Sequence, residues 1–245
     1  RADVVGRSLW AGDAVKIIRQ GTKQSQYPVG ILFDISGPKL RLDRFEGEIK
    51  LKLGDRITLV TKGTDLSKRQ IAVNHPAIIQ SLRKGERLFI DDGKVAFTVT
   101  SVSKEQVTAE AINPGVLSSA KGINLPDTDL AISTITQKDK KDIESAVKLG
   151  ADLVALSFVR SGDDIIEAKR LIKKFGGHQR VIAKLEKKEA IAKLEDILLL
   201  TDGVMIARGD LGVELPPAEL PHLQREIIRM ANRHHKPVIV ATQML

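Results

Sequence analysis

The chain has 245 residues, with 39 Lys and Arg against 31 Asp and Glu, and no cysteine. The missing cysteines exclude a disulfide framework and a thiolate metal site, and an aromatic content of 3% lacks the stacking platforms of single-strand nucleic-acid binders. No apolar run approaches the roughly 20 residues that span a bilayer, and no signal peptide opens the chain. We therefore expect a cytoplasmic protein without membrane or nucleic-acid partners, whose net charge of +8 attracts anionic metabolites.

The first predicted strand covers residues 30–34 and ends in the carboxylate of Asp34. Short alternating segments follow at 49–53, 56–60, 87–90, 94–100 and 106–111, a spacing typical of a small all-β module. Asp91-Asp92-Gly93 predicts a hairpin turn between two of these segments. An insertion after a strand's carboxyl end would cover a site there like a lid.

From residue 127 onward, strand and helix patterns alternate, which predicts a parallel sheet or barrel. Capping-box pairs, Thr136 with Asp139 and Ser161 with Asp164, mark two helix starts. The predicted helices are 137–149, 162–174, 188–199 and 217–234, and the predicted strands are 153–158, 181–186, 204–208 and 238–242. We therefore expect residues 1–41 and 127–245 to form an α/β barrel and residues 42–126 to form an inserted β domain.

Polar side chains gather where the predicted parallel strands end. Lys184 and Glu186 share one face of their strand because side chains alternate. Asp210 follows the next strand on a glycine-flanked turn, and Thr242 ends the last strand. A single Lys-x-Glu is usually a solvated edge, but several polar strand ends at one sheet edge predict a single site, to which Asp34 also belongs.

Seven motifs in one order carry a resemblance to a known family: Gly-Pro-Lys-Leu-Arg (37–41), Ile-Asp-Asp-Gly (90–93), Lys-Gly-Ile-Asn-Leu-Pro (121–126), Ser-Phe-Val-Arg (157–160), Lys-Leu-Glu (184–186), Ala-Arg-Gly-Asp-Leu-Gly (207–212) and Ala-Thr-Gln-Met-Leu (241–245). The chain resembles the pyruvate kinase family from about Val29 to its last residue. The resemblance implies a (β/α)8 TIM-type barrel, incomplete in this chain, with an inserted small β barrel that closes over the nucleotide. Residues 1–5 would be its second strand, and the first and eighth strands and a C-terminal regulatory domain would be missing.

The activity that the resemblance implies is phosphoryl transfer from phosphoenolpyruvate to ADP, giving pyruvate and ATP, the last step of glycolysis, in a homotetramer. Glu186 and Asp210 would hold Mg²⁺ or Mn²⁺, a hard-oxygen site. Lys184 would stabilise the transferring phosphoryl group, and Thr242 would take part in proton delivery. The implied substrate-binding residues are Ser157, Lys184, Gly209, Asp210 and Thr242.

The nucleotide would be bound by Arg41 and Lys121, with Asp92 brought by the closing β domain. Asp34, Ile35 and Lys39 correspond to the monovalent-cation region. Many family members carry Glu at the position of Lys39 and need K⁺. Members with Lys at this position are expected to work without K⁺, because the ammonium takes the cation's electrostatic role. The resemblance therefore implies that K⁺ is not required.

One departure keeps other hypotheses open. The family's Arg-x-Asn-Phe-Ser-His-Gly segment is replaced here by residues 6–12, Gly-Arg-Ser-Leu-Trp-Ala-Gly. A catalytically impaired relative that retains the metal and oxyacid pocket is the main alternative. A different metal-dependent enzyme of the pyruvate-enolate barrel type, an aldolase or lyase, would share the Glu and Asp ligands but needs neither the β insertion nor Lys121.

Overall fold

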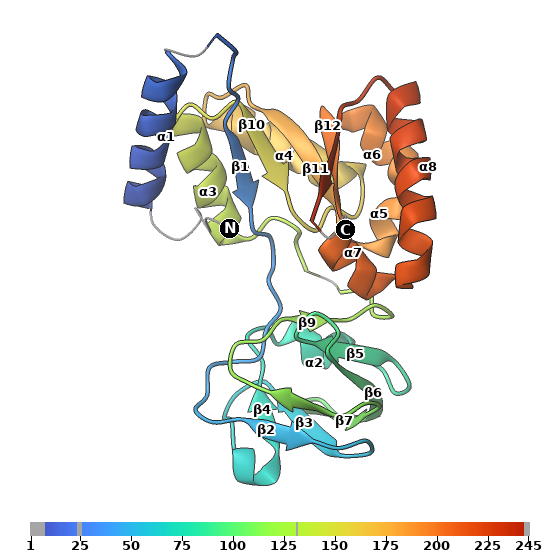
Figure 1. Cartoon of the computed structure of the whole chain (residues 1–245). Helices are drawn as coiled ribbons and strands as arrows, with labels where there is room; N and C mark the ends of the chain where they lie inside the picture. The colour runs from blue at the N-terminus through green and yellow to red at the C-terminus, as the bar shows by residue number, and fades with distance from the viewer. Residues whose placement is uncertain (1–7, 24–25, 131, 243–245) are drawn as a thin grey trace. The chain divides into compact units, whose positions relative to one another are not determined.

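The computed structural model describes residues 8–23, 26–130 and 132–242 (Figure 1). The described residues divide into two compact units. The first, called the α/β unit here, comprises residues within 1–38, 133–211 and 218–245, and the second, called the β unit, comprises residues within 39–132 together with 212–217. The predicted strand at residues 1–5 lies outside the described residues.

A parallel sheet in the order β1-β10-β11-β12-β13 forms the centre of the α/β unit. Its strands are β1 (Leu32–Ile35), β10 (Leu153–Leu156), β11 (Arg180–Leu185), β12 (Gly203–Ala207) and β13 (Val238–Ala241). The register aligns Asp34 with Ala155, and Ala155 with Ile182. Since all five run in the same direction, their carboxyl ends lie at one edge, as the alternating pattern predicted.

Helices flank this sheet, with α3 packed on β1, α4 on β11 and α8 on β12 (Figure 1). They include α1 (Ser8–Thr22), α3 (Gln137–Lys148), α4 (Gly162–Lys174), α5 (Lys188–Ala192), α6 (Leu194–Leu200) and α8 (Leu220–Arg233). Helix α7 (Arg208–Glu214) and a 3₁₀ turn, η3 (Pro217–Glu219), each have residues in both units. The predicted capping boxes are confirmed: Asp139 accepts the Thr136 N–H at 2.8 Å, and Asp164 accepts the Ser161 N–H at 3.2 Å.

Two local predictions in this unit were wrong. The helix expected over 188–199 breaks at Lys193 (φ −115°, ψ 26°), after which α6 buries Leu194, Ile197 and Leu198. The glycine-flanked turn expected around Asp210 is the short helix α7, which places Asp210 in a first turn, where the helix dipole favours a carboxylate. Helix α1 was not predicted, because its glycines at positions 12 and 21 weaken the helical pattern.

The β unit contains a six-stranded sheet, β4-β3-β7-β6-β5-β9, and a two-stranded pair, β2-β8. The strands are β2 (Ile49–Leu51), β3 (Arg56–Val60), β4 (Gln70–Ala72), β5 (Arg87–Ile90), β6 (Val95–Val102), β7 (Gln106–Ala111), β8 (Gly115–Leu117) and β9 (Ile123–Asn124), with α2 (Ala77–Ser81) and a 3₁₀ turn, η2 (Leu66–Lys68). Alternation buries one face of the sheet: Val95, Phe97 and Val99 of β6 are buried, whereas the residues between them are partly exposed. The predicted hairpin at 91–93 joins β5 to β6.

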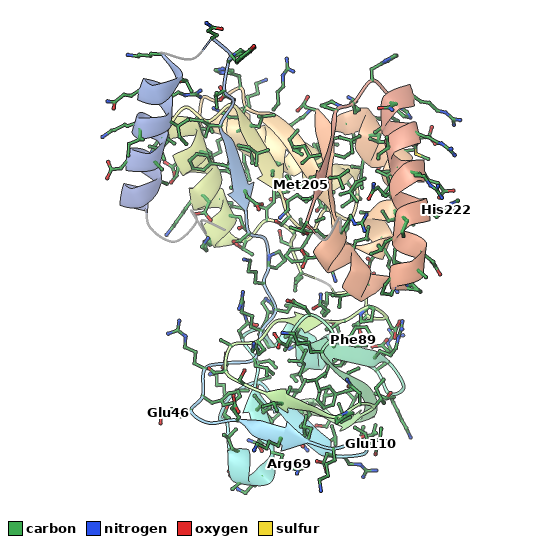
Figure 2. The ribbon with its side chains drawn as sticks, in the orientation of Figure 1. Glu46, Arg69, Phe89, Glu110, Met205 and His222 are labelled. Atoms are coloured by element: carbon green, nitrogen blue, oxygen red, sulfur yellow. The ribbon has the colours of Figure 1, made fainter. Side chains whose placement is uncertain are left out.

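An apolar core of its own stabilises the β unit. Its members come only from residues 42–125, and Phe97, Leu59 and Ile71 are fully buried. Figure 2 shows Arg69 and Glu110 at the periphery of this unit, where they pair with Asp55 and Arg56. Among the residues that the structure describes, no helix combines the length and apolar composition that crossing a membrane requires.

Candidate active site

Lys184 is the centre of a cluster of polar side chains at the carboxyl ends of the parallel strands. Its Nζ lies 2.9 Å from Glu186 Oε1 and 3.0 Å from Asp34 Oδ1, and it donates to Ser157 Oγ at 2.8 Å. The side chain is only 12% exposed. Burial lowers the pKa of Lys184, but the carboxylates of Glu186 and Asp34 outweigh burial and raise the pKa above its usual value. The cluster therefore holds a fixed ammonium ion.

Three neighbouring strands supply these groups. Asp34 comes from β1, Ser157 directly follows β10, and Lys184 lies on β11. Ser157 also donates a longer hydrogen bond to Asp34 Oδ1, at 3.4 Å. The parallel register aligns the strand ends, so residues far apart in sequence meet at one point.

Glu186 is the most deeply buried acid of the cluster, with 2% of its side chain exposed. Its Oε2 accepts the main-chain N–H of Phe158 at 2.8 Å. Burial raises the pKa of Glu186; Lys184 opposes this rise, and the nearby carboxylate of Asp210 adds to it. The two carboxylates are thus close enough to repel each other, an arrangement that a shared cation would relieve.

The donor set suits a divalent metal ion with oxygen ligands. Asp34, Glu186 and Asp210 contribute three carboxylates against the one ammonium of Lys184. Across the described ranges, no group of three or more His, Cys, Asp or Glu side chains could hold a metal ion unaided. Mg²⁺ commonly uses one or two carboxylates and takes its other ligands from water and substrate, so Glu186 and Asp210 fit that ion.

The remaining site residues predicted in the α/β unit lie on the same strand ends. Gly209 is in the first turn of α7, immediately before Asp210. Thr242 is exposed and directly follows β13, with a positive φ of 60°. Ile35 is the buried last residue of β1. Ser157 and Asp34 contact Lys184 directly. The roles of Gly209, Thr242 and Ile35 stay predictions.

The predicted nucleotide residues belong to the β unit. Lys121 pairs with Asp91 at 3.0 Å, and Asp91 also pairs with Lys94 at 3.0 Å. Arg41 forms a β-bridge with Gly122 and donates to the carbonyl of Ala120 at 2.9 Å. Asp92 is exposed in the β5–β6 turn. Arg41 and Lys121 therefore lie on adjacent segments within the β unit.

Lys39, expected to act near Asp34, is exposed in the β unit, where its carbonyl accepts from Asn74 at 2.7 Å. The ammonium that pairs with Asp34 in the structure is that of Lys184. The effect of Lys39 on K⁺ dependence stays a prediction.

Phe158 is a participant that sequence reasoning did not single out. Its contribution is a main-chain N–H, which no side-chain pattern encodes. The available signal was its place directly after Ser157, at the end of a parallel strand.

The fold and the site together define an α/β barrel-type protein with an inserted β domain and a lysine–carboxylate cluster at the strand ends. A family model, pyruvate kinase barrel domain, matches residues 8–245. The chain belongs to the pyruvate kinase family.

Curated relatives support this assignment over nearly the whole chain. A pyruvate kinase of Corynebacterium efficiens is 42% identical over 94% of this chain, and pyruvate kinase 2 of Synechocystis is 42% identical over 98%. A pyruvate kinase of Geobacillus stearothermophilus is 37% identical over 96%. The chain spans 49%, 42% and 40% of the lengths of these three relatives, respectively.

Proposed function

We propose that this protein transfers the phosphoryl group of phosphoenolpyruvate to ADP, forming pyruvate and ATP. The observation that carries the proposal is the buried ammonium of Lys184, held between Glu186 and Asp34 at the strand ends with Asp210 near Glu186. The relatives at 37% to 42% identity are pyruvate kinases by name. In this reaction the phosphorus–oxygen bond of the enol phosphate breaks, a new bond forms to the terminal phosphate of ADP, and a proton is added to the enolate carbon.

Lys184 is proposed to stabilise the charge of the phosphoryl group in flight. A loose phosphoryl-transfer transition state spreads charge over its equatorial oxygens, and a pre-positioned ammonium lowers its energy without reorganisation. The contacts to Ser157 and Asp34 hold the Lys184 Nζ in place before substrate arrives. Ser157 is proposed to contact substrate from the same position.

Glu186 and Asp210 are proposed to hold Mg²⁺ or Mn²⁺. The bound ion would supply positive charge to phosphate and enolate oxygens. Gly209 allows close approach of the main chain to the substrate carboxylate, and Thr242 is proposed to orient the proton donor at the enolate carbon. Threonine is itself a poor acid, so a water molecule is the expected proton source.

The β unit is proposed to bring Arg41, Lys121 and Asp92 to the nucleotide. Arg41 offers a forked guanidinium and Lys121 a compact ammonium, both suited to phosphate. We further propose that Lys39 replaces a bound K⁺, that residues 42–126 act as a lid, and that the protein works as a homotetramer in the cytoplasm.

The direct test is pyruvate formation from phosphoenolpyruvate and ADP by the full chain, with and without Mg²⁺. Metal-dependent turnover should disappear in Asp210→Asn and in Glu186→Gln. Asp163→Asn, which removes an exposed carboxylate from α4, should retain it. Binding of oxalate in the presence of Mg²⁺ without any product would instead support the catalytically impaired relative, and absence of both binding and turnover would contradict the proposal.

A further inference from the structure

The turn after β10 supports Lys184, near the end of β11, and Glu186, which directly follows β11. Ser157 accepts from Lys184, and the next residue, Phe158, donates its N–H to Glu186. Phe158 adopts a positive φ of 55°, a conformation that is uncommon for residues other than glycine and unfavourable for a bulky one. The direction of its N–H depends on this backbone conformation, so the geometry of Glu186 depends on what keeps Phe158 there.

Gly37, just after β1, leaves the space against which the Phe158 ring packs, which is called the seat here. A Cβ atom at Gly37 would lie 2.8 Å from Phe158 Cδ2, too short for the ring to stay in place, and 3.4 Å from Ser157 Cβ. Gly37 itself has a positive φ of 63°. The absence of a side chain at Gly37 is therefore what lets the ring pack against the end of β1.

A buried acid holds the main chain of Gly37 in place. Its N–H donates to Asp139 Oδ1 at 3.1 Å, while Asp139 Oδ2 accepts the Thr136 N–H at 2.8 Å. Asp139 is fully buried. The capping box of α3 thus anchors the seat on which Phe158 rests.

We propose that Phe158 and Gly37 are positioning residues for the metal ligand Glu186. The ring, seated on Gly37, keeps Phe158 in its left-handed conformation, and this conformation aims the N–H that orients the Glu186 carboxylate. The inference rests on the proposed role of Glu186 in binding a divalent cation. Neither residue touches the reacting atoms, so their effect on metal affinity should exceed their effect on the chemical step.

The test is direct titration of Mn²⁺ by calorimetry in the full chain, comparing three residues at position 158. Phe158→Ala removes the ring and leaves a residue that avoids positive φ, so Mn²⁺ affinity should fall about tenfold, the scale of one lost hydrogen bond to a charged group. Phe158→Gly removes the ring too, but glycine adopts positive φ freely, so its affinity should stay within about threefold of the wild type. If Phe158 served packing alone, Phe158→Gly should bind Mn²⁺ more weakly than Phe158→Ala, because glycine loses more contacts and more chain entropy on folding than alanine.

A second pair of variants tests the seat. Gly37→Ala should weaken Mn²⁺ binding, because the new methyl group would displace Phe158. Gly150→Ala is its matched control: Gly150 also has a positive φ, 70°, but open space where a Cβ would be added. Both changes strain the backbone and should lower the melting temperature, whereas only Gly37→Ala should lower Mn²⁺ affinity.

The outcomes separate this inference from the proposed function. If Glu186→Gln binds Mn²⁺ as the wild type does, the proposed metal role fails and the inference falls with it. Two other outcomes would refute the positioning role of Phe158 while leaving the metal role of Glu186 intact. In both, Glu186→Gln loses Mn²⁺ binding; in the first, Phe158→Ala binds Mn²⁺ within about twofold of the wild type, and in the second, Phe158→Gly binds Mn²⁺ more weakly than Phe158→Ala.

Discussion

The two units present their candidate residues in different ways. In the α/β unit, Lys184 and Glu186 are largely buried and pair with each other. Lys184 also contacts Asp34 and Ser157, and Glu186 accepts the main-chain N–H of Phe158. In the β unit, Lys121 is 35% exposed and its partner Asp91 lies in a hairpin turn. The α/β unit is therefore organised before a ligand binds, whereas the β unit offers solvated charges.

This difference follows from how each fold brings residues together. Parallel strands end at one edge, so buried side chains converge there without needing long loops. An antiparallel hairpin ends in a turn on the surface, where charges stay hydrated and ion pairs contribute little. We therefore expect changes in the α/β unit to affect the rate of the chemical step. Changes in the β unit should affect nucleotide affinity, apart from changes at Lys39, for which an electrostatic role is proposed.

The largest expected effect comes from Lys184→Met, which should lower kcat about 10³-fold, because it removes the charge proposed to stabilise the transferring group. Steady-state rates of pyruvate formation give the measurement, with Lys193→Met, which changes an exposed lysine between α5 and α6, as the control. Because the change also leaves Glu186 buried without its ammonium, circular dichroism should accompany it. A folded Lys184→Met variant with more than a tenth of the wild-type kcat would remove Lys184 from the mechanism.

Lys39→Glu tests whether a residue of the β unit can influence the chemical step. Turnover without K⁺ should fall about 100-fold, because an electrostatic contribution is lost, and added K⁺ should restore it. The wild type should show no K⁺ requirement. Lys104→Glu, an exposed lysine between β6 and β7, makes the same charge change elsewhere in the unit and should behave as the wild type does. A wild type that needs K⁺ would refute the role given to Lys39.

Lys121→Ala should raise the KM for ADP about tenfold while leaving kcat within about a factor of two, because the proposed contact of Lys121 with a nucleotide phosphate is lost. Lys94→Ala is a matched control, since Lys94 pairs with the same Asp91 at the same 3.0 Å but is 71% exposed. Equal KM values for ADP in the two variants would mean that Lys121 makes no specific contact with the nucleotide.

The smallest expected effect concerns the stability of the β unit in acid. Burial raises the pKa of Asp91, but the hydrogen bonds from Lys121 and Lys94 outweigh burial and lower it below the ordinary value of 3.8. A lowered native pKa stabilises the fold above the unfolded-state pKa, and this contribution is lost as the pH falls through the native value. Asp91→Asn should therefore cost under about 1 kcal/mol at pH 7, and the difference should shrink as the pH falls below 3.8.

Urea unfolding of the wild type and Asp91→Asn at neutral pH and at a series of pH values below 3.8 measures this effect. Asp92→Asn is the matched control, because Asp92 has nearly the same positive φ, 55° against 57°, but an exposed side chain. A destabilisation by Asp91→Asn that is as large in acid as at neutral pH would show that the ion pair is not its cause.

Much of the α/β unit could be predicted from sequence because its signals are local. Apolar runs, capping boxes and alternation gave the strands and most helices, and alternation alone placed Lys184 and Glu186 on one face. The same reasoning failed around Asp210, because glycines 209 and 212 suggest a turn although the segment forms α7. Local propensity is a weak signal where tertiary packing decides the conformation.

The contacts that complete the site could not be predicted. The hydrogen bond from Phe158 to Glu186 depends on a backbone conformation that phenylalanine seldom adopts, and the seat at Gly37 depends on pairing β1 with β10 across more than a hundred residues of chain. In the β unit, the short strands β4, β8 and β9 carried too few residues for an alternating pattern to be recognised.

The measurement that tests the central claim most directly is a crystal structure of the protein with Mn²⁺ and oxalate, using the anomalous signal of manganese to locate the ion. We predict one strong peak bonded to oxygens of Glu186 and Asp210, with the Lys184 Nζ facing oxalate. A manganese peak elsewhere, with Glu186 and Asp210 contacting no metal ion, would contradict the assignment of this cluster as the phosphoryl-transfer site.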